Sequence, residues 1–131
     1  MHMNTQMILS QADSRPIYIQ IMDEINRRVA LGDWAPGFRL PSIRELASDL
    51  KVSVITVKRA YLELERAGVI VTQQGRGSFV NERVDVDDVR EGELKRYLEQ
   101  AVRLASSMGL GHDDLVELLE EFTDTDGGNR S

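Results

Sequence analysis

The sequence predicts a mainly α-helical chain with one small β-hairpin, arranged as a compact domain followed by a short two-helix extension. Three observations lead to this prediction. Apolar residues recur at helical spacing over most of the chain, the spacing becomes that of strands only over residues 69–81, and 131 residues suffice for one domain with an extension. We expect an N-terminal arm over residues 1–15, the domain over 16–83, and the extension with a disordered end over 84–131.

The first predicted helix begins at Pro16, a residue that suits the first turn of a helix, and ends before Gly32. One face is apolar because isoleucine and valine recur at four-residue steps. The residues of this face are Ile17, Ile21, Ile25 and Val29. A connection rich in turn residues, DWAPGFRLPS, follows.

The second and third predicted helices are separated by a short turn. Ser42 and Glu45 have the spacing of a capping box at the start of a helix over residues 42–50, and Ser53 caps a third helix that stops at Gly68. Their predicted buried faces are Ile43, Leu46, Ala47 and Leu50 in the second helix and Val57, Ala60, Tyr61 and Leu64 in the third. The first turn of the third helix, SVITVK, adds little to these faces and is therefore free to contact something else.

After Gly68 the pattern is that of strands. The segment VIVTQQGRGSFVN contains two β-rich runs, residues 69–73 and 78–81, around the glycine-containing turn QGRG, which predicts a hairpin. Helix, helix, turn, helix and hairpin in this order are typical of a winged helix-turn-helix domain.

Charge is distributed unevenly along the chain. The net charge is −6, yet residues 39–83 hold eight Lys or Arg against five Asp or Glu, and residues 84–131 hold five against thirteen. A basic middle segment can bind a polyanion, because only charges that face phosphates release counterions; the alternative is a solvated imbalance with no function. The chain has no cysteine, which excludes a disulfide framework and a thiolate metal site, and it has no apolar run long enough for a membrane helix. We expect a protein of the reducing cytoplasm with no membrane partner.

The first turn of the third predicted helix has the composition of a groove-reading surface. In helix-turn-helix proteins this turn enters the major groove of DNA. Ser53, Thr56 and Lys58 offer polar groups to bases or phosphates, whereas Val54 and Ile55 are apolar and would meet thymine methyl groups if they face the groove. The alternative is that Ile55 packs on the hairpin or on the N-terminal arm.

The segment GDWAPGFRLPSIRELASDLKVSVITVKRAYLELERAGVIVTQQGRGSFV resembles the DNA-binding domain of the GntR family of bacterial transcription regulators. The family shows the patterns G-x-[WFY]-x-P-G-x-x-L-P-S-x-R-x-L-A and V-S-x-x-T-V-x-x-A-[YL]-x-x-L-x-x-x-G-[LV]-I, followed by a glycine-rich wing. The resemblance covers about residues 16–81, and the short two-helix tail is similar to the YtrA-like branch. It implies a sequence-specific DNA-binding regulator, a repressor that binds an inverted-repeat operator as a homodimer.

The resemblance also implies which residues contact DNA. In the family, the residues that correspond to Arg44, Thr56 and Lys58 do so, the wing tip at 74–76 reaches the minor groove, and Arg39 is placed to clamp a phosphate. The predicted DNA-binding residues are Arg39, Ser42, Arg44, Ser53, Val54, Ile55, Thr56, Lys58, Gln74, Gly75 and Arg76. The family often has Arg-Asn or Asn-Pro where this chain has Val54-Ile55.

The C-terminal extension carries an apolar face that predicts dimerisation. The residues of this C-terminal apolar face are Leu94, Tyr97, Leu98, Ala101, Leu104, Ala105, Met108, Leu115, Leu118, Leu119 and Phe122. They recur at a spacing of about 3.5 residues, as in helices that pack together. The alternative is that the extension folds onto its own winged domain.

Other classes of protein are less consistent with the residues present. No Ser/His/Asp arrangement or phosphate-binding loop suggests an enzyme, so we expect no catalytic residue and no cofactor. His112, Asp113 and Asp114 are adjacent at a helix start, where they suit a cap and the helix dipole better than a metal ion. A winged helix that binds only protein would show no salt-sensitive affinity for DNA. The sequence does not identify a small-molecule effector.

Overall fold

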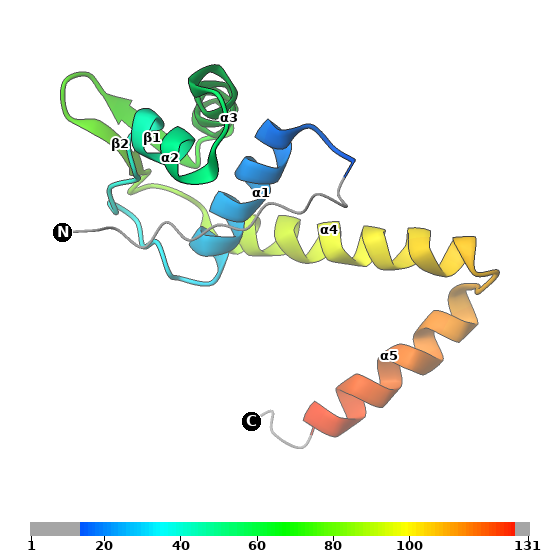
Figure 1. Ribbon diagram of the computed structural model, residues 1–131. Coiled ribbons are helices and arrows are strands. Elements are labelled where there is room, and N and C mark those ends of the chain that lie inside the picture. Colours follow the sequence, from blue (N-terminus) through cyan, green and yellow to red (C-terminus); the bar gives the residue numbers. More distant parts are fainter. Residues whose placement is uncertain (1–13, 128–131) are drawn as a thin grey trace. The chain divides into compact units, whose positions relative to one another are not determined.

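The computed structural model describes residues 14–127 (Figure 1). Its elements are α1 (Ile17–Ala30), α2 (Ile43–Leu50), α3 (Val54–Arg66), β1 (Ile70–Gln73), β2 (Gly77–Val80), α4 (Val86–Ser107) and α5 (His112–Gly127). The prediction of a mainly helical chain with one hairpin is confirmed. Helix α5 continues into the segment expected to be disordered, and the predicted arm lies almost wholly outside the described residues. The chain divides into two compact units between Glu93 and Leu94, inside α4.

The core of the first unit lies among α1, α2 and α3, and β1 and β2 close it on one side. The helical spacing predicted from the sequence is confirmed for α3 and for most of α1. Ile17 is an exception, because it lies at the start of α1 and is 37% exposed. The side chains that are almost wholly buried include Ile21, Ile25, Val29, Leu40, Leu46, Val57, Leu64, Ile70 and Val80. In α2, Leu46 and Ala47 are buried, while Ile43 and Leu50 pack at the edge of the core.

The two helix starts have the predicted caps. Ser42 Oγ accepts a hydrogen bond from the Glu45 backbone N–H at 3.0 Å, and the Ser42 N–H donates to Glu45 Oε1 at 3.0 Å. Ser53 Oγ accepts from the Thr56 N–H at 3.1 Å. Between the two helices, Lys51 has a left-handed backbone with φ of 57°. Such a residue ends one helix abruptly and lets the next begin within a few residues.

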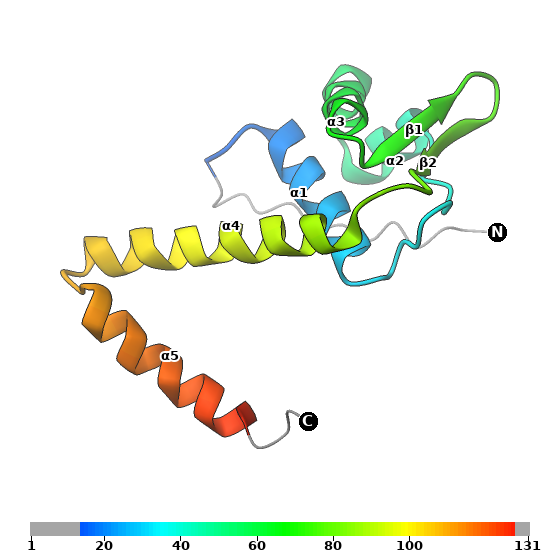
Figure 2. The ribbon, with the colours of Figure 1, turned by 180° about the vertical axis from the view of Figure 1, so that it is seen from behind.

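The hairpin is antiparallel and pairs Ile70 with Val80 and Gln73 with Gly77 (Figure 2). A third segment, residues 37–40 of the connection before α2, pairs with the free edge of β2. The Leu40 N–H donates to Ser78 O, and the Val80 N–H donates to Phe38 O, both at 2.8 Å. The sequence predicted only turns here, because the pairing joins segments far apart in the chain and leaves no local periodic pattern.

The start of α4 belongs to the first unit. Asp85 Oδ1 accepts from the Asp88 N–H at 3.0 Å and so caps the helix, and Val89 packs against the core. Arg90 Nε donates to Ala30 O, at the C-terminal end of α1, over 2.8 Å. These contacts attach the beginning of α4 to the domain.

The second unit consists of the rest of α4, a turn at Gly109, and α5, which diverges from α4 after the turn (Figure 1). Most side chains of the C-terminal apolar face are exposed in the single chain, including Leu98 at 49% and Phe122 at 71%. Ala105 is different, since it is only 4% exposed and is thus already covered within one chain. Over residues 14–127 no helix is both long and apolar enough to cross a membrane.

Candidate nucleic-acid interface

The first turn of α3 is held by its neighbours but presents its side chains outward. Val57 is fully buried and anchors the turn, while Ile55 is 78% exposed and Val54 is 47% exposed. The described part of the hairpin therefore does not bury Ile55. The hydroxyl oxygens of Ser53 and Thr56 lie 2.7 Å apart and hydrogen-bond to each other. Only one of the two hydroxyls donates in this pair, so the other keeps its O–H for an acceptor outside the turn.

A buried hydrogen bond fixes the start of α2 relative to α3. The Tyr61 hydroxyl donates to the Pro41 carbonyl oxygen at 2.7 Å, and Tyr61 is only 3% exposed. Burial, with a smaller contribution from the charge of Glu45, raises the pKa of Tyr61, so the hydroxyl stays a donor. The hydrogen bonds from the backbone and then the side chain of Ser42 lower the pKa of Glu45. The capped end of α2 thus carries Arg44 in a defined place, exposed to solvent.

The hairpin tip forms the second part of the candidate interface. Gln74, Gly75 and Arg76 are exposed in the turn between β1 and β2, where the Arg76 N–H donates to Gln73 O at 2.9 Å. The Arg39 side chain crosses the sheet beside Gly77, whose φ is 119°; a Cβ atom there would lie 3.0 Å from Arg39 Nε. A glycine at this position therefore makes room for the guanidinium group.

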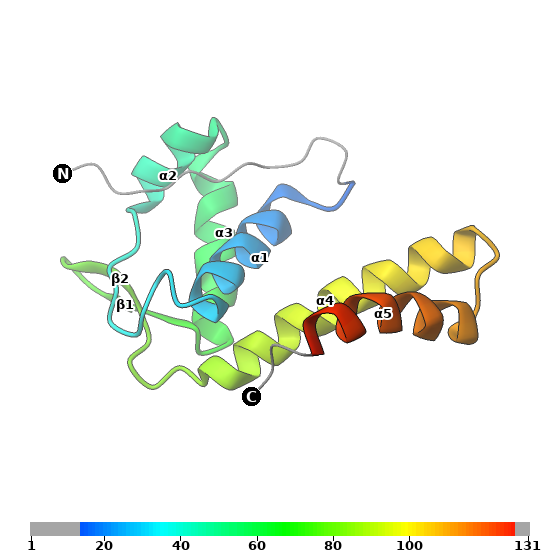
Figure 3. The ribbon, with the colours of Figure 1, turned by 90° about the horizontal axis from the view of Figure 1, so that it is seen from below.

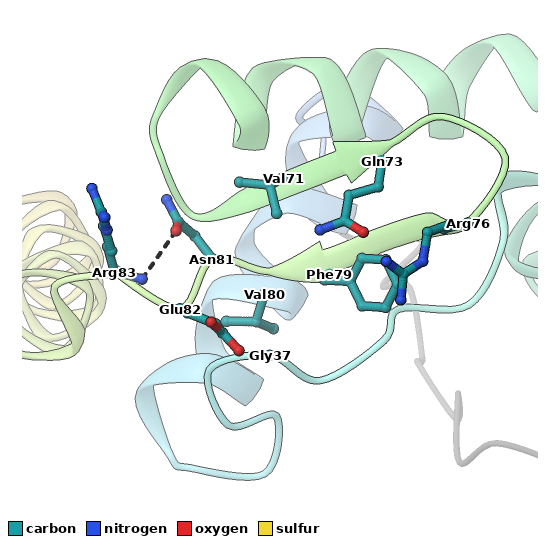
Figure 4. Close-up of a pocket in the computed structure, with 9 residues that line it drawn as sticks. All are labelled: Gly37, Val71, Gln73, Arg76, Phe79, Val80, Asn81, Glu82 and Arg83. Carbon is teal, nitrogen blue, oxygen red and sulfur yellow. Dashed lines mark hydrogen bonds between the residues drawn. The ribbon is translucent and has the colours of Figure 1, made fainter.

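The outer face of the hairpin is a shallow groove of about 400 Å³ (Figure 4). Arg76 lies near the Phe79 ring at one end of it, and Arg83 lies at the other end beside Asn81, whose Oδ1 accepts from the Arg83 N–H at 3.0 Å. The residues that line the groove are Gly37, Val71, Gln73, Arg76, Phe79, Val80, Asn81, Glu82 and Arg83. The groove thus has a mixed polar and apolar lining, which includes the acidic Glu82, with a basic residue at each end.

The basic side chains of residues 39–83 differ from those in the rest of the described chain in how few of them form ion pairs. Among the basic side chains of residues 39–83, Arg66 pairs with Glu63, with the Arg66 Nη1 and Glu63 Oε2 atoms 3.0 Å apart. The others form no ion pair with a carboxylate of residues 14–127; they are Arg39, Arg44, Lys51, Lys58, Arg59, Arg76 and Arg83. Basic residues elsewhere in residues 14–127 all have an interaction partner, such as Asp23 for Arg15 and Glu99 for Arg103. Cations that are left without carboxylates on one part of a protein indicate a surface for a polyanion.

The predicted residues lie on two parts of the structure. Ser42, Arg44 and the first turn of α3 belong to the helix-turn-helix, and Arg39 lies beside the wing that carries Gln74, Gly75 and Arg76. Lys51, Arg59 and Arg83 were not predicted from the sequence, because a missing ion pair is visible only in three dimensions. Ser42 and Ser53, which were predicted, are used as helix caps. Within the described residues, no cluster of three or more His, Asp or Glu side chains could hold a metal ion.

A winged helix-turn-helix domain with an exposed recognition turn and unpaired cations defines a DNA-binding protein. The profile of the family "Bacterial regulatory proteins, gntR family" matches residues 17–80. The chain is 37% identical to the "HTH-type transcriptional repressor YtrA" of Bacillus subtilis (strain 168) over 122 residues, which covers 90% of this chain and 93% of the relative. The chain belongs to the GntR family of bacterial regulatory proteins.

Solved structures agree with this assignment. The "GntR family transcriptional regulator from Listeria monocytogenes" is 31% identical, with a TM-score of 0.70 over 83% of this chain and 96% of that one. The structure of AraR(DBD) in complex with operator ORE1 is 30% identical, with a TM-score of 0.50 over 59% of this chain and 94% of that one. The protein is a helix-turn-helix transcription regulator of the YtrA-like type.

Proposed function

We propose that the protein is a repressor that binds an inverted-repeat operator as a homodimer. The observation that carries this proposal is the exposed first turn of α3 in a segment, residues 39–83, whose basic side chains other than Arg66 form no ion pair with a described carboxylate. Neutralising DNA phosphates with such cations releases counterions, and this release provides much of the affinity. The similarity to a repressor and to a DNA-binding domain in complex with an operator supports the same reading.

The first turn of α3 would enter a major groove. There Val54 and Ile55 would contact thymine methyl groups, Lys58 would reach a guanine or a phosphate, and Thr56 would bond to a phosphate or base. Arg44, in the preceding helix α2, would contact the DNA beside this turn. Contacts of this kind separate into those that read bases and those that set the position of the protein.

The wing would lie along the neighbouring minor groove. Arg76 and Gln74 at its tip would enter the groove, and Arg39, which lies over Gly77, would clamp a phosphate at its edge. The short glycine-containing turn brings the backbone close to the DNA. These contacts would position the domain and carry little sequence information.

The second subunit would bind through the C-terminal apolar face. Exposed apolar side chains such as Leu94, Tyr97 and Leu98 form a larger apolar patch than a lone helix keeps in water. Ala105 would support this face from within one chain. A two-fold dimer places two recognition helices on equivalent half-sites, so the operator would be an inverted repeat. The proposed activity needs no catalytic residue or cofactor and places the protein with the DNA in the bacterial cytoplasm.

The test is binding to the DNA upstream of the protein's own coding start, measured by fluorescence anisotropy across a range of salt concentrations. We expect a palindrome in that region to bind at least 10³-fold more tightly than a random duplex, with affinity that falls steeply with salt. Lys58→Ala should weaken binding, while Arg103→Ala, which removes the same charge from an ion pair in α4, should not. Equal, salt-insensitive affinity for all duplexes would refute the proposal.

A further inference from the structure

One basic side chain of the recognition helix lies on an aromatic ring instead of beside a carboxylate. The guanidinium carbon of Arg59, in α3, lies 3.9 Å from the centre of the Tyr18 ring, in the first turn of α1. Helices α1 and α3 are side by side in the first unit (Figure 3). Arg59 remains exposed to solvent, and no acidic side chain of residues 14–127 forms an ion pair with it.

Arg59 lies next to the first turn of α3, the turn that would enter the major groove. It follows Ile55 by four residues, so the two side chains share one face of the helix, about 6 Å apart along the axis. Lys58, the predicted base or phosphate contact, is its neighbour in sequence. Ile55 would lie within the major groove, so a side chain one turn further along the same face would lie at the groove's edge, where the sugar–phosphate backbone runs.

The contact with Tyr18 is not needed to hold α1 against α3. The helices are joined by buried side chains, including the wholly buried Ile21, Ile25 and Val57. The Tyr18 ring restricts the rotamers of Arg59, a long side chain that otherwise samples many of them. Stacking uses the flat face of the guanidinium group and leaves its N–H edge free, and that edge matches the oxygens of a phosphate.

We propose that Arg59 binds a DNA backbone phosphate at the edge of the major groove, and that Tyr18 is the residue that positions it. This inference rests on the proposed DNA binding and adds a contact outside the predicted set. Arg59 sets how the domain sits on the duplex and therefore strengthens binding to specific and random DNA alike.

The decisive comparison is Arg59→Ala with Arg66→Ala. Both remove one positive charge from an exposed position on α3, but Arg66 lies near the far end of the helix and pairs with Glu63. We expect Arg59→Ala to weaken binding to both operator and random duplex about tenfold and to reduce the slope of log affinity against log salt by about one. Arg66→Ala should change affinity less than about twofold. Equal effects of the two variants, or an unchanged salt slope in Arg59→Ala, would overturn the proposal.

The positioning role of Tyr18 is tested by measuring whether the effect of changing Tyr18 on DNA affinity depends on the presence of Arg59. Tyr18→Leu should weaken DNA binding several-fold. Tyr18→Phe should keep most of the wild-type affinity, because it keeps the ring. In an Arg59→Ala background, Tyr18→Leu should have no further effect on affinity. Arg59→Lys should keep the salt slope but recover only part of the affinity. A loss of affinity in Tyr18→Leu that persists without Arg59, or a Tyr18→Leu chain that binds like wild type, would show that Tyr18 does not position Arg59.

Failure of this inference can be told apart from failure of the proposed function. If the wild-type chain and Lys58→Ala bind DNA alike and without salt sensitivity, the proposed function itself fails. If Lys58→Ala weakens binding and Arg59→Ala matches Arg66→Ala, only this inference fails.

Discussion

The hydrogen bond between Tyr61 and Pro41 provides a stability prediction that can be worked out from the structure. Tyr61→Phe removes the hydroxyl but keeps the ring, so packing is unchanged. The carbonyl oxygen of Pro41, a fully buried residue, then loses its donor. Leaving a buried acceptor unsatisfied costs about 1–3 kcal/mol. The melting temperature of a domain of this size should fall by roughly 4–8 °C for each kcal/mol lost.

Urea unfolding followed by circular dichroism measures this cost. Tyr18→Phe is the matched control because the Tyr18 hydroxyl has no hydrogen bond to the described part of the chain. A loss below about 0.5 kcal/mol for Tyr61→Phe, or one equal to the control, would refute the reasoning. DNA binding at temperatures well below the transition should change little.

The pH dependence gives an independent check. The pKa of Tyr61 is raised in the folded protein by burial, so the native state keeps its proton where the unfolded chain, with a tyrosine pKa of about 10, loses it. The stabilisation by Tyr61 is therefore complete below that pH and is lost as the pH rises towards the folded pKa. Wild type and Tyr61→Phe should converge in unfolding free energy above about pH 10.

Three further predictions concern the interface and the extension. Arg44→Ala should weaken operator binding by roughly 1–3 kcal/mol with unchanged melting, and affinity within error of wild type by anisotropy would remove Arg44 from the site. Gly77→Ala should lower stability by more than Gly75→Ala, because its Cβ would displace Arg39. Gly75, with φ of 78°, has open space around it, so Gly75→Ala should cost only backbone strain of about 1 kcal/mol; matched melting curves for the two variants would contradict this. Ala101→Glu should give a folded monomer by light scattering that binds a palindrome about 10²–10⁴-fold less tightly, and a dimer that survives would make the extension something other than the subunit contact.

Local chemistry was enough to predict the helices of the domain. The spacing of Ser42 and Glu45 predicted a capping box, and Ser53 predicted the start of α3, because a cap depends on side chains and backbone within one turn. The hairpin was predicted from a change of period and a glycine turn. In these places the physical cause lies within a few residues of its effect.

Contacts between distant segments were not predictable in this way. The pairing of Phe38 and Leu40 with β2 has no local signal, since the residues belong to a proline- and glycine-rich connection. The stacking of Arg59 on Tyr18 requires the angle between two helices. Ala105 shares the spacing of the C-terminal apolar face but is covered within one chain, which periodicity alone cannot distinguish. The predicted DNA contacts remain predictions until binding is measured.

The pairing of residues 37–40 with β2 also has a consequence for the order in which the domain folds. A two-stranded hairpin alone is at best marginally stable in water, so the wing needs this third segment. The segment reaches its partner only after the intervening α2 and α3 have brought the two parts of the chain together, because closing so long a loop costs entropy before any contact repays it. The wing should therefore be among the last parts of the domain to become protected from hydrogen exchange during refolding, and among the first to open when α1 or α3 is destabilised.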